Sequence, residues 1–156
     1  MLIVDDNEFN AYSLQTILLM NDVLSDMCHN GEDAVEKVKE SLNCCPYKIV
    51  FMDMQMPKMD GPTATRHITA YLSDYVETCK NKILVTQINE IVICALTAND
   101  SESDRDVCRK AGMTEFMTKP FNQQYLWRLL KRVLNLEDLD LPEGDMEEQN
   151  NMMDDY

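Results

Sequence analysis

Short apolar runs and longer segments with helical periodicity alternate along residues 1–136. Continuous apolar runs predict strands that are buried on both faces of a sheet, and apolar residues three and four positions apart predict helices between them. Five strand–helix units in alternation predict an α/β fold, a doubly wound five-stranded parallel sheet with right-handed crossovers and helices on both faces. The expected strands are residues 2–4, 23–27 (a weak one), 49–52, 91–96 and 115–118.

Local turn signals indicate where the helices begin and end. Asn7 is a candidate N-cap for the first helix, since its side chain can accept hydrogen bonds from the free backbone N–H groups of the first turn. Asn30-Gly31 is a turn signal before the second helix. Gly112 is expected to end a helix over residues 101–111, because glycine readily adopts the left-handed conformation that often follows a helix.

One connection between strands is longer than the others. Asp53 and Thr97 are 44 positions apart, whereas Thr97 and Lys119, which bound the next strand–helix unit, are 22 positions apart. The excess lies near residues 77–90, which we interpret as an insertion. Its apolar run at 83–85 is compatible with an added strand, a longer helix end or a lid.

Composition narrows the class of protein. A chain of 156 residues with 45% hydrophobic and 27% charged residues is typical of one globular domain. No apolar run approaches the roughly 20 residues that a membrane-spanning helix needs, and the first residues lack the basic start and apolar core of a signal peptide. We therefore expect a cytoplasmic protein, or the cytoplasmic part of a membrane-bound one, whose six cysteines stay reduced.

The negative charge is concentrated at the carboxyl end of the chain. The formal net charge is −14, and nine of the 28 acidic residues, but no Lys or Arg, lie in residues 137–156. We interpret this segment as an acidic, disordered tail and residues 1–136 as the folded domain. The acidic balance argues against direct binding to nucleic acid, whose phosphates need a basic surface.

The residues at the carboxyl ends of the expected strands are the candidates for chemistry. Asp5 and Asp6 follow the first strand, Asp53 the third, Thr97 the fourth and Lys119 the fifth. Each is ordinary by itself, as a cap, a loop acid or a helix entry. In an open parallel sheet, however, these ends meet at the edge where ligands bind. Three neighbouring carboxylates need a compensating charge, which Mg²⁺ and a lysine can provide, and this combination of groups suits phosphoryl transfer onto an aspartate.

Four ordered stretches of the sequence resemble one known family, the receiver domain of two-component response regulators. They are Leu-Ile-Val-Asp-Asp-Asn at 2–7, Ile-Val-Phe-Met-Asp-Met-Gln-Met-Pro at 49–57 with Met-Asp-Gly at 59–61, Ala-Leu-Thr-Ala-Asn at 95–99, and Ala-Gly-Met at 111–113 leading to Phe-Met-Thr-Lys-Pro-Phe at 116–121. The resemblance covers residues 1–136 and is greatest to receivers fused to hybrid sensor histidine kinases. It implies the flavodoxin-like receiver fold, with strand order 2-1-3-4-5.

The resemblance assigns a role to each residue of the expected pocket. It implies that Asp53 accepts a phosphoryl group from a phosphohistidine of a histidine kinase or a histidine phosphotransfer protein. Asp6 is expected to bind Mg²⁺ directly and Asp5 through water, while Asp53 and the main-chain carbonyl of Gln55 complete the protein ligands of the metal. Lys119 is expected to pair with the phosphoryl oxygens.

The resemblance also implies a conformational switch. The hydroxyl of Thr97, with the Ala98 amide nearby, is expected to hydrogen-bond the phosphoryl group. Phe116 matches the switch aromatic, whose inward or outward position follows Thr97, so phosphorylation is expected to alter partner binding on the adjoining surface. An ordinary core aromatic is the simpler interpretation of Phe116. The peptide bond between Lys119 and Pro120 is commonly cis in such domains.

Three other functions are compatible with this fold. A phosphatase or phosphotransferase with an Asp nucleophile commonly carries a second acid two positions later, and here that position is Gln55. A flavin-binding domain needs a phosphate-binding loop after the first strand, where the acids at 5 and 6 repel phosphate. A receiver that serves only as a scaffold does not need the complete set of acids, hydroxyl and amine. The sequence thus favours a phosphoacceptor signalling domain over an enzyme, and it is compatible with a fragment of a longer hybrid kinase.

Overall fold

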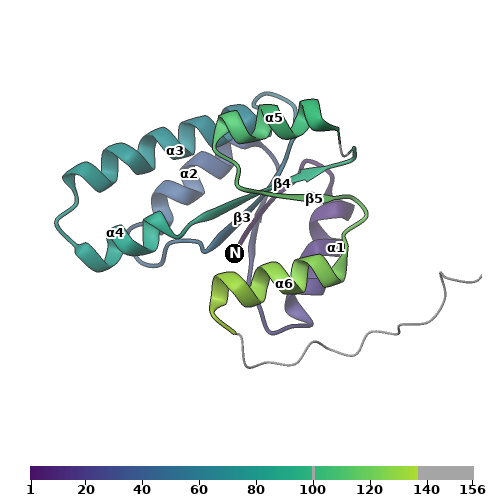
Figure 1. Ribbon diagram of the computed structural model, residues 1–156, viewed down its shortest axis with the longest axis horizontal. Helices are drawn as coiled ribbons and strands as arrows, with labels where there is room; N and C mark the ends of the chain where they lie inside the picture. Colours follow the sequence, from purple (N-terminus) through teal and green to yellow (C-terminus); the bar gives the residue numbers. More distant parts are fainter. Residues whose placement is uncertain (100, 137–156) are drawn as a thin grey trace, which may run out of the picture.

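Five parallel strands form a single sheet in the computed structural model, which describes residues 1–99 and 101–136. The strands are β1 (Leu2–Val4), β2 (Asp26–Cys28), β3 (Ile49–Asp53), β4 (Val92–Thr97) and β5 (Glu115–Thr118). Their order is β2-β1-β3-β4-β5, and each neighbouring pair is parallel (Figure 1). The doubly wound sheet and the strand order expected from the sequence are confirmed.

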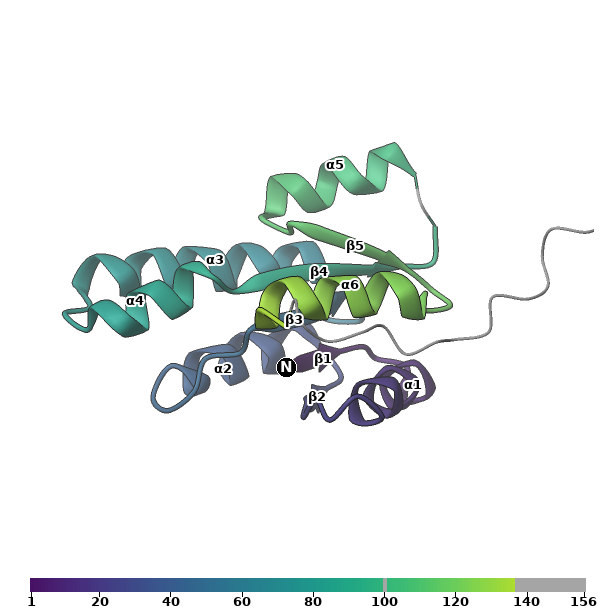
Figure 2. The same cartoon turned by 60° about the horizontal axis from the view of Figure 1, so that its bottom comes forward.

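Helices cover both faces of the sheet. In the described part of the chain they are α1 (Glu8–Leu19), α2 (Gly31–Ser41), α3 (Gly61–Thr78), α4 (Lys82–Asn89), α5 (Glu102–Ala111) and α6 (Gln123–Leu134). Helices α1 and α6 lie on one side of the strands, whereas α2, α3 and α5 lie on the other (Figures 1 and 2). The expected caps are present, since the Asn7 side chain accepts hydrogen bonds from two first-turn amides of α1, and Gly112, with φ of 103°, ends α5.

The central strand β3 alternates its side chains between two hydrophobic cores. Val50 and Met52 belong to the core on the side of α2, α3 and α5, whereas Ile49 and Phe51 belong to the core under α1 and α6. Every residue of β3 is buried, which explains the continuous apolar run in the sequence. Burial of each such large side chain contributes roughly 1.5–3 kcal/mol. The strand therefore holds its last residue, Asp53, in a fixed position.

The predicted bounds of the second strand were wrong. The strand was expected to begin at Val23, but the Val23 N–H donates to the Leu18 carbonyl and so closes the turn after α1. Pairing with β1 begins only near Asp26, whose N–H donates to the Met1 carbonyl. Because β2 is an edge strand and buries only Cys28, its sequence lacks the apolar run that marks the central strands.

The segment 77–90 contains the end of α3 and the whole of α4. Asn81 caps α4 by accepting hydrogen bonds from the amides of Ile83 and Leu84. Helix α4 lies beside the carboxyl-terminal half of α3 (Figures 1 and 2), and its buried residue Ile88 packs into the same core as α3. The apolar run at 83–85 is therefore neither an added strand nor a continuation of α3, but part of a separate short helix that the sequence analysis did not anticipate. That this segment is an insertion stays a prediction.

Three further expectations concern the chain as a whole. None of the six cysteines is paired in the structure, and that their thiols stay reduced is still a prediction. None of the helices in residues 1–99 and 101–136 has both the length and the apolar character needed to cross a bilayer. The acidic tail predicted at 137–156 lies outside the described residues.

Candidate functional site

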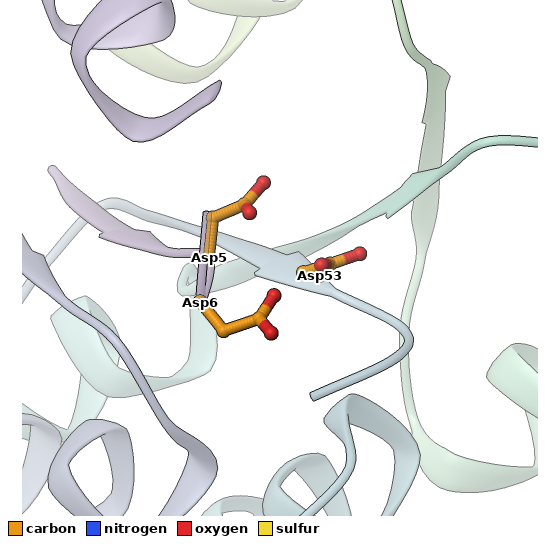
Figure 3. Close-up of side chains that lie close together, drawn as sticks. All are labelled: Asp5, Asp6 and Asp53. Carbon is orange, nitrogen blue, oxygen red and sulfur yellow. The ribbon is translucent and has the colours of Figure 1, made fainter. Parts of the chain in front are cut away.

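Three aspartates meet at the carboxyl end of the sheet. Asp5 and Asp6 follow β1 and Asp53 ends β3, and the two strands are neighbours in register, with Val4 opposite Met52. One carboxylate oxygen from each aspartate lies within 4.8 Å of the others. All three side chains project from the same side of these strand ends (Figure 3). The convergence expected from the parallel topology is therefore present.

The three carboxylates differ in their exposure to water. Asp5 is completely buried, Asp53 is 8% exposed, and Asp6 is exposed at the surface. Burial of a carboxylate disfavours its charged form. For Asp53 this burial is the main reason that its pKa is raised; the nearby Asp5 adds to the rise, while Lys119 and the backbone amide of Gln55 oppose it.

Lys119 connects the two buried carboxylates. Its Nζ lies 2.6 Å from Asp5 Oδ2 and 3.0 Å from Asp53 Oδ1. The residue follows β5, and its backbone N–H donates to the Thr97 carbonyl at 2.8 Å, which fixes the start of this loop against β4. The Lys119–Pro120 peptide bond is cis, as the resemblance implied. One ammonium among three carboxylates leaves the cluster with an excess of negative charge.

Asp5 has hydrogen-bond donors on its other oxygen as well. Asp5 Oδ1 accepts a hydrogen bond from the Asn7 backbone N–H at 3.0 Å and from Asn10 Nδ2 at 3.4 Å. The charge of this fully buried group is therefore compensated on both sides, by amides at Oδ1 and by Lys119 at Oδ2. Asp5 is thus a fixed, buried member of the cluster, whereas Asp6 presents its carboxylate to the surface.

The loop after Asp53 depends on a close backbone approach at Gly61. A Cβ atom at this position would lie 2.1 Å from the Asp53 carbonyl oxygen, a distance that no side chain can tolerate. The Gly61 N–H also donates to the Met54 carbonyl, and the Asp60 side chain caps α3 by accepting from the Thr63 amide. The first turn of α3 is thereby packed directly on the backbone of the acidic cluster.

Thr97 ends β4, one residue beyond the partner of Asp53 in the register. The residue Thr97 is 7% exposed. Its hydroxyl donates a hydrogen bond to the Asn99 carbonyl at 2.6 Å and accepts one from the Asn99 N–H at 3.1 Å. Its hydrogen bonds are therefore made within its own loop in this structure. Ala98 and Gln55 are both exposed beside the cluster.

Phe116 lies outside the acidic cluster. It pairs with Ala95 in the β4–β5 register and packs against the core on the side of α5. The guanidinium carbons of Arg105 and Arg109 lie 5.3 and 5.8 Å from the centre of its ring, within the range of a cation–π contact. Phe116 and Thr97 are thus on neighbouring strands, two register positions apart, which is compatible with the coupling expected from the sequence.

The donor set of the cluster fits Mg²⁺. The ion prefers hard oxygen ligands and usually binds through one or two carboxylates while keeping several waters. Asp6 is exposed and Asp53 is close to it, so these two can provide carboxylate oxygens on the solvent side of the cluster. The excess negative charge that Lys119 leaves uncompensated favours a divalent cation at this position.

Comparison with known families decides which fold family this is. The family described as response regulator receiver domain matches residues 1–131, which is most of the chain. The chain belongs to this family. Its curated relatives include hybrid signal transduction histidine kinase B of Dictyostelium discoideum, to which the receiver domain is 35% identical over 136 residues, and histidine kinase 5 of Arabidopsis thaliana, with 28% identity over 146 residues. Both alignments cover 86% of this chain, but only 6% and 15% of the respective relatives.

Solved structures give the same result for the fold. A chain in the complex of the histidine phosphotransfer protein Ypd1 with the receiver domain of Ssk1, from Saccharomyces cerevisiae, has 26% identity and a TM-score of 0.71, covering 88% of this chain and 90% of that one. The receiver domain of histidine kinase CKI1 from Arabidopsis thaliana, solved with Mg²⁺, has 27% identity and a TM-score of 0.69, covering 85% and 89%. The receiver domain of sensor histidine kinase PA1611 from Pseudomonas aeruginosa, with magnesium in its active-site cleft, has 29% identity and a TM-score of 0.63, covering 86% and 95%.

Sequence reasoning identified the acids and the lysine of this receiver domain but missed one contributor. Asn10 reaches Asp5 from the first turn of α1. The contact depends on how the first turn of α1 is oriented, so the apolar pattern of the sequence does not reveal it. Gly61 entered the sequence analysis only as the last residue of the matched stretch at 59–61. The structure shows that its close approach to the Asp53 carbonyl fixes the start of α3 against the end of β3.

Proposed function

We propose that this phosphorelay receiver domain accepts a phosphoryl group on Asp53. The position of Lys119 carries the proposal, since one ammonium contacts both Asp5 and Asp53 beside a third carboxylate. Such an arrangement holds a nucleophilic carboxylate and a fixed positive charge in one partly buried pocket. Positioning and charge stabilisation are the main requirements of phosphoryl transfer.

The transfer itself needs one bond to form and one to break. A carboxylate oxygen of Asp53 attacks the phosphorus of a phosphohistidine; the O–P bond forms, the P–N bond breaks, and the imidazole leaves with the electron pair and takes a proton from solvent. Lys119 lies where its ammonium can pair with a phosphoryl oxygen on Asp53. Asp6, Asp53 and the Gln55 carbonyl would hold Mg²⁺, with Asp5 acting through water, and the ion would supply positive charge to the phosphoryl oxygens.

The proposed response to phosphorylation begins at Thr97. Its hydroxyl leaves Asn99 and, together with the Ala98 amide, hydrogen-bonds the phosphoryl group. The movement changes the space beside Ala95, toward which Phe116 can then turn from the two arginines of α5. The surface formed by α5, β5 and α6 is altered as a result, which supports a change in partner affinity.

The competing functions receive less support from the geometry. An Asp-nucleophile phosphatase needs a second acid for its leaving group, and Gln55 is an exposed amide. A flavin phosphate would meet Asp5 and Asp6 after β1 instead of a phosphate-binding loop. A pure scaffold does not require Lys119 to contact two buried carboxylates. Since the chain spans only 5–15% of the length of its curated relatives, we propose that it acts as the receiver of a hybrid histidine kinase; its cytoplasmic location stays a prediction.

Labelling by a small phosphodonor tests the proposal. Incubation with an acyl phosphate and Mg²⁺ is expected to add one phosphoryl group, and chelation of the metal is expected to suppress the addition at least tenfold. Intact mass spectrometry measures the addition, and peptide mapping after borohydride reduction identifies the modified residue. Labelling at a residue other than Asp53, or equal labelling in chelator, would contradict the proposal. Sustained release of phosphate from unrelated phosphoesters would favour the phosphatase instead.

The exposed face of α1 supports docking of a phosphohistidine-bearing protein beside the pocket. Phe9 and Tyr12 are 79% and 54% exposed, and α1 begins two residues after Asp6. Large apolar side chains that remain in water at the edge of a charged site are typical of an interaction surface. We propose that a histidine phosphotransfer protein or histidine kinase binds here. The Ssk1 receiver, solved in complex with the phosphotransfer protein Ypd1, is a precedent for such a partner.

Substitution of Phe9 by serine is expected to slow transfer from a protein donor while leaving labelling by acyl phosphate unchanged. The loss of one central apolar contact lowers kcat/KM about tenfold. Phosphorylated Ypd1 serves as the donor in a time-course of phosphotransfer. Ile83→Ser is the matched control, because Ile83 is 74% exposed on α4 and lies outside both the α1 face and the surface of α5, β5 and α6. Equal effects of the two substitutions would reject docking through α1.

A further inference from the structure

The network around Asp5 has one member with no assigned role. Asp5 is completely buried, and its two oxygens are used differently: Oδ2 lies 2.6 Å from Lys119 Nζ, and Oδ1 accepts from the Asn7 N–H at 3.0 Å and from Asn10 Nδ2 at 3.4 Å. Two of these donors already have an explanation: one is the backbone N–H of Asn7, and the other is the ammonium of Lys119. The third is a side-chain amide that belongs to α1.

We propose that Asn10 is a positioning residue for the Mg²⁺ site, acting through Asp5. Its amide N–H holds Oδ1 toward α1 and so leaves Oδ2 directed at Lys119, where the carboxylate would act on a bound cation through water. An oxygen of the same amide cannot replace this contact, since two acceptors would face each other; the N–H must therefore point at the carboxylate. The inference rests on the proposed function, because the Mg²⁺ site is part of it.

The backbone amide of Asn7 cannot fix the carboxylate by itself. Without Asn10, each oxygen of Asp5 would keep one donor, the Asn7 amide at Oδ1 and Lys119 at Oδ2; Asn10 adds a second donor at Oδ1 and so restricts rotation of the carboxylate further. Groups that hold a metal-binding carboxylate in place typically change metal affinity about tenfold or more when removed. Asn10 makes a long contact of 3.4 Å, so we expect an effect at the lower end of this range.

Asn10 also connects the pocket to α1. Its side chain is anchored to Asp5, while the adjoining Phe9 is exposed on the same first turn. The Asn7 side chain secures this turn from its other end by accepting from the amides of Phe9 and Asn10. The start of α1 is thus joined to the acid pair through two asparagines, one by its backbone and one by its side chain.

Calorimetric titration with MgCl₂ of the unphosphorylated chain tests the role of Asn10. Asn10→Leu removes the donor while keeping the branching and the number of heavy atoms of the side chain, and its Mg²⁺ dissociation constant is expected to rise about tenfold. Labelling by acyl phosphate is expected to need correspondingly more Mg²⁺ but to reach the wild-type rate at saturation. Asn21→Leu is the matched control: Asn21 Nδ2 donates to the Ile17 carbonyl at the other end of α1, so this variant loses an amide contact on the same helix without touching Asp5.

The outcomes separate this inference from the proposed function. Unchanged Mg²⁺ affinity in Asn10→Leu, or an equal loss in Asn21→Leu, overturns the role of Asn10 while the function stands. A labelling rate of Asn10→Leu that stays low at saturating Mg²⁺ also overturns the role of Asn10, because weaker Mg²⁺ binding alone would not explain it. Failure of the wild-type chain to bind Mg²⁺ or to be labelled overturns the proposed function itself. If Asn10→Leu does not fold, Asn10→Ala is titrated in its place, with thermal unfolding recorded for each variant.

Discussion

Replacement of Asp53 by alanine is expected to abolish labelling by acyl phosphate completely. The variant loses the only proposed nucleophile, while Asp5 is committed to Lys119 and to two amides and is therefore unable to replace it. Intact mass after incubation with donor and Mg²⁺ measures the result. Asp74→Ala is the control, since Asp74 is an exposed acid of α3 and its loss leaves the cluster intact. Undiminished labelling of Asp53→Ala would remove the central assignment.

The same substitution is expected to raise the free energy of unfolding at neutral pH in the absence of metal. Burial raises the pKa of Asp53 above its ordinary value, so the folded state binds a proton at this residue more readily than the unfolded state does. The stability that this residue contributes is therefore present below the unfolded pKa and is lost as the pH rises through the folded pKa. Above that window the ionised carboxylate opposes folding, and its removal is stabilising. Denaturant unfolding from pH 3 to 7 measures the difference, which is expected to grow with pH; a difference that shrinks with pH contradicts it.

Replacement of Lys119 by methionine is expected to strengthen Mg²⁺ binding and to slow labelling by acyl phosphate. Removal of the ammonium leaves Asp5, which is completely buried, without its nearest positive charge, and breaking such a pair typically costs about 3 kcal/mol of stability. The cluster becomes more negative, so Mg²⁺ is expected to bind more tightly and to restore part of the lost stability. Labelling is nevertheless expected to fall about a hundredfold, because the charge that pairs with the phosphoryl oxygens is gone.

Three measurements on one variant check this expectation. Calorimetry gives the Mg²⁺ affinity, denaturant unfolding with and without Mg²⁺ gives the stability, and the time-course of labelling gives the rate. Lys110→Met, an exposed lysine of α5, controls for the loss of one positive charge from the whole domain. Weaker Mg²⁺ binding in Lys119→Met, or a rate equal to that of Lys110→Met, would show that Lys119 does not act as proposed.

The sequence predicted those features that depend on burial and topology. The run at 49–53 shows a central strand because both faces of β3 are covered, and the convergence of Asp5, Asp6, Asp53 and Lys119 follows once the strands are parallel. The bounds of β2 were wrong because an edge strand that buries only Cys28 carries little apolar pattern.

Features that depend on individual contacts were not predictable in this way. Helix α4 was left open because a short segment with β-branched residues at 83 and 85 suits a strand and a buried helix equally well. The contact of Asn10 with Asp5 depends on how the first turn of α1 is oriented, and the hydrogen bonds of Thr97 to Asn99 depend on the path of a loop. Neither the turn nor the loop leaves a periodic signal in the sequence.

The α3–α4 pair projects away from the acidic cluster, so the turn between the two helices lies far from the candidate site. Helix α3 starts at Gly61 against Asp53 and runs for 18 residues, which at 1.5 Å per residue makes it about 27 Å long and places its far end well away from the acidic cluster. The turn at residues 79–81, between the two helices, is the outermost point of this projection (Figure 1). A reporter protein inserted at this turn is therefore expected to be carried by the domain without disturbing the acidic cluster.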